Sequence, residues 1–299
     1  MWALWALASA ASHGIIAVLD KRLLDHHLPG VSVLYLWIAL VLAVDAVLVL
    51  LFTGFPASPP TDQVVVAFAS GLSFGVGLAF MFVGLRMEEA SRAIAIPQIY
   101  PVFVAMLAVM FLGETLNQLQ WGAIVLVVVG TMLVSLREVP DRSTFRPSWG
   151  LPILVGSGLF LGLTFFAGKY SLADLSVWTV FALQQIGNVV AFTVFARPRV
   201  WRQLFAVLRR RNTLILLLTA EGPMPFVAII LGLQAAKVGP ISLVSAFLAT
   251  MPLFVFFFSV GLSHGRWRFL EESLNQRSLA LKFVSIVIIV LGVSFLGLP

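Results

Sequence analysis

The sequence predicts an all-α polytopic membrane protein with ten transmembrane helices, arranged as two inverted five-helix repeats. Three observations favour this fold class: the composition, ten long apolar runs, and a hexapeptide that recurs in the two halves. Of the 299 residues, 60% are hydrophobic and 11% are charged, whereas roughly a quarter of the residues in a soluble domain are charged. This composition excludes a water-soluble globular protein and a disordered chain. The absence of cysteine excludes disulfides and thiol chemistry.

A transmembrane helix needs about 20 predominantly apolar residues, and ten runs approach or exceed this length. Short breaks that are polar or contain proline and glycine separate the runs. Stretches such as 124–134 are apolar on every side, which favours helices over the alternating strands of a membrane barrel. The predicted helices cover residues 2–18, 31–52, 64–85, 93–112, 118–136, 150–169, 177–195, 213–235, 241–263 and 279–298.

An internal duplication is indicated by a hexapeptide that precedes the fifth and tenth runs. The sequence GETLNQ at 113–118 recurs as EESLNQ at 271–276. The two predicted units, residues 1–147 and 148–299, hold five spans each. Since five is odd, the second unit must enter the membrane from the opposite side, so the repeat is predicted to be inverted.

Each hexapeptide also contains a local helix-start pattern. Thr115 with Gln118, and Ser273 with Gln276, match the S/T-x-x-Q capping box. The glutamate before each pattern lies beside a helix N-terminus, where negative charge is favoured. We therefore expect these glutamates to cap the helices that directly follow them.

The basic residues are distributed unevenly between the loops. Loops after the odd-numbered spans hold 16 of the 19 Lys and Arg residues. The positive-inside rule then places these loops in the cytoplasm and both termini outside. The net charge of +6 is explained by topology, so no nucleic-acid partner is expected. The largest cluster, 197–211, is predicted to form an interfacial helix on anionic lipid, because apolar residues recur in it at helical spacing: Trp201, Leu204, Phe205 and Leu208.

Several segments match a family pattern: Asp20-Lys21, residues 88–92, 100–103 and 112–115, and the following span with Gly130. In these segments the chain resembles the EamA family of the drug/metabolite transporter superfamily. The resemblance implies two five-helix units in the bacterial inner membrane and a central cavity built mainly from the first, third, fourth, sixth, eighth and ninth helices. It further implies alternating-access transport of a small organic metabolite, which we expect to be export. Familiar members are drawn with cytoplasmic termini, opposite to the orientation that the charges predict.

Glu221 is the strongest candidate for a substrate-binding residue. It lies within the eighth span and is followed by Gly-Pro-Met-Pro. Pro223 and Pro225 remove backbone donors and so free carbonyl oxygens, and a broken helix beside an ionisable group is typical of a transporter midplane site. We expect Glu221 to bind a proton or a substrate amine. The alternative is a protonated or hydrogen-bonded glutamic acid at a structural kink.

Three further side chains are expected to contact substrate through hydrogen bonds. His13 lies in the first span and can titrate near neutral pH, although a histidine at a helix contact is the alternative. Gln98 and Tyr100 lie between two prolines of the fourth span. Helix kinks are predicted at Pro97, Pro101, Pro223, Pro225 and Pro252.

Lys21 and Lys169 occupy corresponding places after the first and sixth spans. Gating or recognition of substrate charge is one interpretation, and snorkelling to the membrane interface is the other.

No P-loop, HExxH or GxSxG motif is present, which favours transport driven by an ion gradient or by facilitation. We expect no catalytic residue, cofactor or metal. The expected partners are a small-molecule substrate and the lipid bilayer, with the protein a monomer or a homodimer. The alternative function is a membrane-embedded enzyme or lipid-handling protein, which would need His13 and Glu221 within reach of one bridging water.

Overall fold

The computed structural model describes residues 1–87, 96–135, 150–263 and 276–296. All regular structure in these segments is helical, which confirms the predicted all-α class. The elements, in chain order, are α1 (Trp2–His26), α2 (Val31–Thr53), α3 (Thr61–Met87), η1 (Ile96–Ile99), α5 (Tyr100–Phe111), α6 (Gln118–Ser135), α7 (Gly150–Ser171), α8 (Val177–Phe192), η2 (Thr193–Phe195), α9 (Pro198–Leu208), α10 (Arg211–Glu221), α11 (Pro223–Val238), α12 (Ile241–Leu248), α13 (Met251–Ser263) and α14 (Gln276–Leu296).

Seven helical segments of the described chain are long and apolar enough to cross a membrane. Three of these segments join helices that follow each other directly, namely α8 with η2, α10 with α11 and α12 with α13. Three shorter apolar helices cover Ile96–Phe111, Gln118–Leu133 and Val284–Leu296. The chain is therefore an integral membrane protein.

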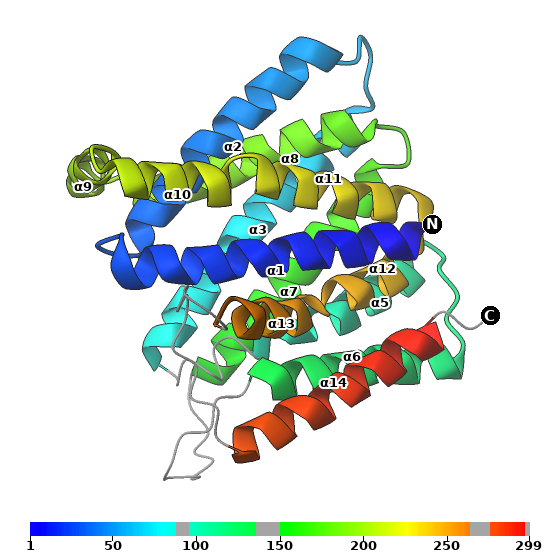
Figure 1. Cartoon of the computed structure of the whole chain (residues 1–299). Coiled ribbons are helices and arrows are strands. Elements are labelled where there is room, and N and C mark those ends of the chain that lie inside the picture. Colours follow the sequence, from blue (N-terminus) through cyan, green and yellow to red (C-terminus); the bar gives the residue numbers. More distant parts are fainter. Residues whose placement is uncertain (88–95, 136–149, 264–275, 297–299) are drawn as a thin grey trace.

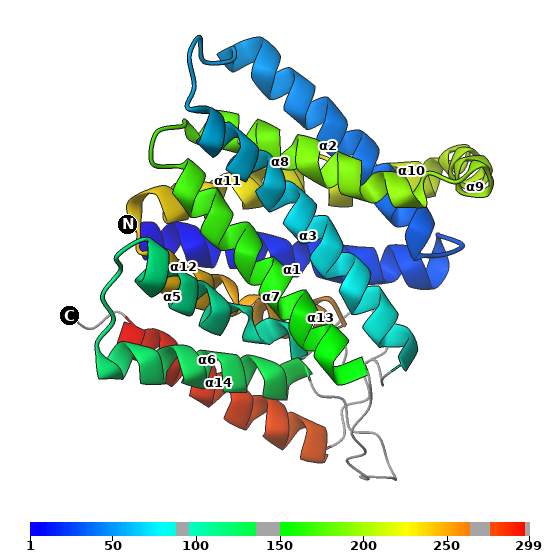
Figure 2. The same cartoon turned by 180° about the vertical axis from the view of Figure 1, so that it is seen from behind.

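The helices form a bundle with α1 near its centre (Figures 1 and 2). α1 packs against α11 on one side and against α12 and α13 on the other. α3 packs against α7 and α8, whereas α5 packs against α7 and α12. α6 and α14 lie side by side at one edge of the bundle, and α2 lies at the opposite edge (Figure 1).

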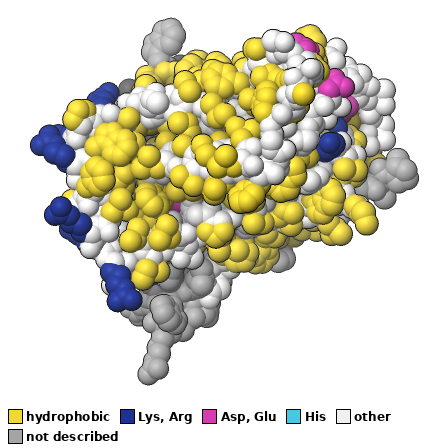
Figure 3. Space-filling view, turned by 90° about the horizontal axis from the view of Figure 1, so that it is seen from above, with side chains coloured by type: hydrophobic (Ala, Val, Ile, Leu, Met, Phe, Trp, Pro, Cys, Tyr) yellow, Lys and Arg dark blue, Asp and Glu magenta, His cyan; other side chains and the backbone are white. Residues whose placement is uncertain are grey.

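Apolar side chains cover much of the outer surface, as the hydrophobic face in Figure 3 shows. Large side chains such as Phe52, Leu51 and Met110 are 87%, 75% and 69% exposed. A soluble monomer rarely exposes so much contiguous apolar area, so this surface suits contact with lipid tails. In the same view most Lys and Arg side chains gather at one end of the molecule (Figure 3).

Helix breaks accompany the prolines in three of the spans. The first is the short 3-10 segment η1, which contains Pro97 and is followed by α5 with Pro101 in its first turn. The second lies at Gly222 between α10 and α11, and Pro223 begins α11. The third separates α12 from α13, where Pro252 lies in the first turn. Proline suits these positions because the first turn of a helix needs no donor from its N–H groups.

Close helix contacts depend on glycine. A Cβ atom on Gly71 of α3 would lie 2.0 Å from the Gln184 carbonyl oxygen of α8. A Cβ atom on Gly187 of α8 would lie 2.2 Å from the Phe68 carbonyl oxygen of α3. The two backbones therefore approach too closely for any larger residue at either position.

Gly71→Ala is expected to destabilise the bundle, because the added methyl group meets the backbone of α8. Overpacking of this kind typically costs about 1–3 kcal/mol, so the thermal midpoint of the detergent-solubilised protein should fall. Gly122→Ala in α6 is the matched control, because no atom lies within 4 Å of the place its Cβ would take. Its midpoint should stay the same or rise. Equal midpoints for the two variants would contradict the tight α3–α8 contact.

Candidate functional site

The candidate site is centred on the break between α10 and α11. Glu221 is the last residue of α10, and its side chain is 4% exposed. Since Pro223 and Pro225 have no N–H, the carbonyl oxygens of Thr219 and Glu221 lose their usual helical donors. The break therefore places a buried carboxyl group beside backbone acceptors within an apolar span.

The carboxyl group of Glu221 lies against that of Asp20 of α1, close enough for the two groups to interact directly. Asp20 belongs to the site, although the sequence analysis named it only within the family-like Asp20-Lys21 segment and not as a site residue. The first predicted helix ended at Val18, whereas α1 continues to His26. Asp20 therefore lies inside a membrane-length helix and not at its end. The signal that could have identified Asp20 is an ionisable residue only two positions after the predicted end of an apolar span, since the helix can continue past that end.

A hydrogen bond between two carboxyl groups requires a proton, because an ionised carboxylate only accepts. Two ionised carboxylates in contact within an apolar bundle would also repel each other strongly. Asp20 Oδ1 and Glu221 Oε1 are both buried. Direct contact between the two carboxyl groups in this apolar setting is therefore favourable only when at least one of them is protonated.

Tyr35 of α2 is the third polar group of this site. It lies close enough to interact electrostatically with both carboxyl groups. Its ring packs against Phe192 and Phe195, with ring centroids 5.3 and 5.4 Å away. The site therefore combines two carboxyl groups with a phenol that neighbouring aromatic rings hold in place.

His13 does not join this pair. It lies seven residues before Asp20 on α1, which corresponds to about 10 Å along the helix. Its Nδ1 atom lies 2.9 Å from the Ser9 carbonyl oxygen, and Ser9 Oγ donates to the Ala228 carbonyl oxygen at 2.7 Å. Among the described residues, the hydrogen-bond partner of the His13 ring is Ser9, and no direct hydrogen bond joins His13 to Glu221.

Tyr100 and Gln98 lie in a different set of contacts. The Tyr100 hydroxyl donates to the Ser245 carbonyl oxygen of α12 at 3.2 Å, and its ring stacks on Phe165 of α7 at 5.1 Å. These contacts join α5 to α12 and α7. Gln98 is half-buried in η1. The structure does not bring either side chain to the Asp20–Glu221 pair.

Lys169 and Glu114 connect helix ends at the opposite end of the bundle. Lys169 Nζ donates to the carbonyl oxygens of Ala236 and Gly239, at 2.7 and 3.0 Å, where α11 ends. The Glu114 carboxylate accepts from the backbone N–H groups of Ile241 and Ser242, at 2.6 and 3.2 Å, and from the Ser242 hydroxyl. Opposite charges thus satisfy the two helix termini on either side of the α11–α12 turn.

The local capping prediction for the first hexapeptide is wrong. Asn117 and Gln120 form the capping box of α6, with backbone-to-side-chain distances of 2.8 and 3.1 Å. Glu114 caps α12 instead. A helix N-terminus attracts any carboxylate within reach, and the fold places α12 closer to Glu114 than the pattern suggested. Residues 271–275 of the second copy lie outside the described segments.

Lys21 differs from its predicted counterpart Lys169, because its side chain is exposed. Within the described segments, no group of three or more His, Asp or Glu side chains is placed to hold a metal ion.

The comparisons with known proteins agree with this architecture. Residues 1–136 match the EamA-like transporter family. The first half of the chain is thus similar to that family. A transporter of Sinorhizobium sp, described as an "Uncharacterized transporter in cobO 3'region", is 27% identical over 138 residues, which cover 45% of this chain and 96% of the relative. One solved crystal structure, described only as a protein, shares the fold with a TM-score of 0.70 and 16% identity, over 99% of this chain and 95% of that chain.

The EamA-like half supplies Asp20 and Tyr35 to the site, whereas Glu221 comes from the part of the chain beyond it. The contact between α1 and the α10–α11 break therefore joins the two halves through buried carboxyl groups.

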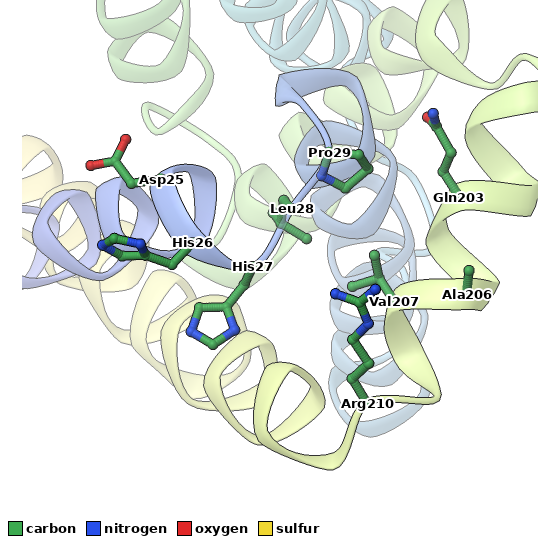
Figure 4. A pocket seen from close by; sticks show the side chains of 9 residues that line it. All are labelled: Asp25, His26, His27, Leu28, Pro29, Gln203, Ala206, Val207 and Arg210. Carbon is green, nitrogen blue, oxygen red and sulfur yellow. The ribbon is translucent and has the colours of Figure 1, made fainter.

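A basic cleft lies at the end of the bundle where α1 meets α9. The cleft has a volume of about 380 Å³ and is lined by Asp25, His26, His27, Gln203 and Arg210 among others (Figure 4). His27 Nδ1 lies 3.2 Å from Thr213 Oγ1. Burial, together with the positive charges of Arg22, His26 and Arg210, holds the pKa of His27 below its ordinary value.

The apolar face of α9 is turned toward the protein. Leu204, Val207 and Val200 are buried in one cluster with residues of α1 and α2, including Leu23 and Leu34. The predicted interfacial segment is thus a helix docked on the bundle, and Phe205, which is 58% exposed, remains available to lipid.

Arg210→Ala is expected to raise the pKa of His27, because protonation of the imidazole would no longer place two positive charges together. The measurement is an NMR titration of the labelled histidine in detergent. Arg199→Ala on the exposed side of α9 is the control and should leave the titration midpoint unchanged. A His27 midpoint that does not respond to Arg210→Ala would contradict the electrostatic coupling across the cleft.

Proposed function

We propose that this protein is a secondary transporter that exports a small organic metabolite across the bacterial inner membrane by alternating access. The observation that carries the proposal is the buried Glu221 carboxyl group at a broken, membrane-length helix. A site of this kind gives a solute both an ionisable partner and free backbone acceptors at the depth where transporters bind their cargo. The EamA-like first half and the transporter relative support the same functional class.

We further propose that the chain is a ten-helix inverted repeat, with units 1–147 and 148–299. Corresponding contacts support this arrangement, in which α1 and α7 are counterparts in the two units. The third span of each unit packs on the first span of the other unit: α3 packs on α7, and α11 packs on α1. The fourth spans do the same: α5 packs on α7, and α12 and α13 pack on α1. Two further contacts join a helix to its own counterpart in the other unit: α5 packs on α12, and α6 packs on α14. The Sinorhizobium relative also supports two units. Nearly all of that protein, which is about half as long as this chain, matches a single stretch of 138 residues, as expected if one unit can exist as a separate protein.

The arginine-rich end of the bundle faces the cytoplasm in this proposal, and both termini face outward. The gathering of Lys and Arg at one end (Figure 3) and the positive-inside rule support this orientation. α9 then lies at the cytoplasmic surface, where its arginines meet anionic headgroups.

Lys169 and Glu114 form the outer gate in the same proposal. Both bind the ends of α11 and α12, so they hold the two helices together at the outer end. Opening toward the outside requires these hydrogen bonds to break. Gln98, Tyr100 and His13 remain proposed cavity residues that meet the cargo in other conformations, and Lys21 has no assigned contact at the inner end.

Glu221→Gln is expected to lower the initial rate of transport by roughly tenfold or more, equivalent to about 1.4 kcal/mol. A thermal-shift screen of metabolites supplies the cargo, because a ligand that binds the folded state raises its apparent stability. Transport of the best compound is then followed in proteoliposomes with and without a pH gradient. Asp62→Asn, at an exposed acid on α3, is the control and should transport normally.

Unchanged transport and unchanged pH dependence in a folded Glu221→Gln protein would remove Glu221 from the mechanism. Turnover of a bound lipid in detergent, without any gradient, would favour the enzyme alternative instead.

Lys169→Met is expected to open the outer end. The chain has no cysteine, so Ala246→Cys creates a single reporter at a fully buried position of α12. An impermeant maleimide should label this cysteine several-fold faster when Lys169 is replaced, because the carbonyl groups at the end of α11 lose their donor. Lys237→Met, an exposed lysine at the same end, is the control. Equal labelling rates in the two backgrounds would contradict a gate at Lys169.

A further inference from the structure

We propose that the basic cleft between the end of α1 and α9 binds the phosphate-bearing headgroup of an anionic phospholipid. The phosphate group bridges the cleft, with Arg210 and Gln203 on one side and the histidines at the end of α1 on the other. The inference requires only that the chain spans a membrane, and it does not depend on the cargo. It rests on the charge of the cleft, on its hydrogen-bond donors and on its position relative to the ends of two membrane spans.

The segment that forms one wall of the cleft is strongly basic. The stretch between Asp174 and Glu221 contains six arginines and no aspartate or glutamate, and all six arginine side chains are exposed. The acidic residue of the cleft lining is Asp25, and in Figure 4 its carboxylate points away from Arg210 and Gln203. An anion is therefore the kind of ligand that the cleft attracts.

The donors of the cleft suit a phosphate group. The Arg210 guanidinium presents a planar set of N–H donors that can bind two phosphate oxygens at once, and the Gln203 amide adds further donors. In Figure 4 the end of the Arg210 side chain lies between those of His27 and Val207. His27 Nδ1 lies 3.2 Å from Thr213 Oγ1, which leaves Nε2 of the ring to serve a ligand. Because these donors come from both walls of the cleft, one phosphate group can hold α9 to the end of α1.

The cleft lies where two apolar spans end. α1 is a membrane-length helix that ends at His26, and the span formed by α10 and α11 begins at Arg211. The cleft is lined by Asp25, His26 and His27 at the end of the first span and by Arg210 directly before the second. The phosphate groups of a bilayer lie at this level, just outside the hydrocarbon core. A lipid headgroup can therefore reach the cleft without leaving the membrane.

The aromatic residues of α9 favour a lipid over a soluble phosphate compound. The Phe205 side chain is 58% exposed, and its ring stacks on that of Trp201 with the centroids 5.9 Å apart. Exposed aromatic rings beside arginines are typical of a helix at a membrane surface. The cleft volume of about 380 Å³ suits a small polar group, so the acyl chains would lie along the exposed apolar surface of the bundle (Figure 3).

The proposed inverted repeat provides a comparison at the other end of the bundle. There α7 ends and α3 begins, as α1 ends and α10 begins at the cleft. Gln63 Nε2 of α3 donates to the Asp174 carboxylate, and the Asp174 backbone N–H donates to Gln63 Oε1 at 3.2 Å. The corresponding contact at the cleft joins His27 to Thr213. The first contact includes an anion of the chain itself, whereas the second lies among basic residues, so an anion from the bilayer would complete it.

The pKa of His27 makes this residue a reporter of the bound phosphate. Burial lowers the pKa, and the positive charges of Arg22, His26 and Arg210 lower it further. A bound phosphate group offsets these charges and favours the imidazolium form. Binding should therefore raise the pKa of His27.

The test uses the full-length protein in detergent, with phosphatidylglycerol, phosphatidylcholine and glycerol 3-phosphate as probes. Native mass spectrometry should detect one phosphatidylglycerol molecule bound about fivefold more tightly than phosphatidylcholine. Arg210→Ala should weaken phosphatidylglycerol binding about tenfold, because a charge-assisted pair of hydrogen bonds is lost. Arg202→Ala is the matched control and should leave the affinity nearly unchanged, because it removes the same charge from an exposed position of α9 outside the described cleft lining.

An NMR titration of the labelled histidines locates the bound lipid. Phosphatidylglycerol should raise the pKa of His27, phosphatidylcholine should not, and Arg210→Ala should remove the lipid-dependent rise. Equal affinities for the two lipids, or equal losses of affinity in Arg202→Ala and Arg210→Ala, would overturn the proposal. Glycerol 3-phosphate at the same concentration should leave the pKa of His27 unchanged, and an equal rise would assign the cleft to a soluble phosphate compound and overturn the lipid site. Both readouts are independent of transport, so either result leaves the proposed transport function as it stands.

Discussion

Satisfaction of backbone polar groups inside an apolar bundle is the constraint on which this structure depends. Each break in a membrane-length helix releases donors and acceptors that water cannot reach. At the α11–α12 turn, Lys169 and Glu114 supply the missing partners. At the α12–α13 break, Thr131 donates to the Ala249 carbonyl oxygen at 3.1 Å. The α10–α11 break differs, because Pro223 and Pro225 supply no N–H donors to the carbonyl oxygens of Thr219 and Glu221.

The sequence predicted the helices well because burial in lipid requires long apolar runs, and most observed elements begin and end within a few residues of the predicted positions. The helix breaks were also foreseeable, since Pro223 and Pro252 cannot continue a helix. The end of α1 was not. The charged cluster that begins at Asp20 looks like a membrane boundary, yet the helix continues to His26. That error of eight residues concealed Asp20, the partner of Glu221.

Contacts between distant segments account for the remaining differences. The hexapeptide at 113–118 contains a plausible local capping box, but Glu114 reaches the start of α12, more than a hundred residues away. Tyr100 looks like a cavity residue because it lies between two prolines, yet its hydroxyl joins α5 to α12. The hydrogen-bond partners of Glu114 and Tyr100 depend on which helices are neighbours in the fold. A pattern in one stretch of sequence carries no information about those neighbours.

The α1–α11 contact has a mechanical consequence. Ser9 joins α11 to α1 through the Ala228 carbonyl oxygen, whereas Glu221, the last residue of α10, lies against Asp20 of α1. Gly222 lies between these two attachments. The segment formed by α10 and α11 is therefore held to α1 on both sides of its break, and Gly222 sets the angle between the two held parts.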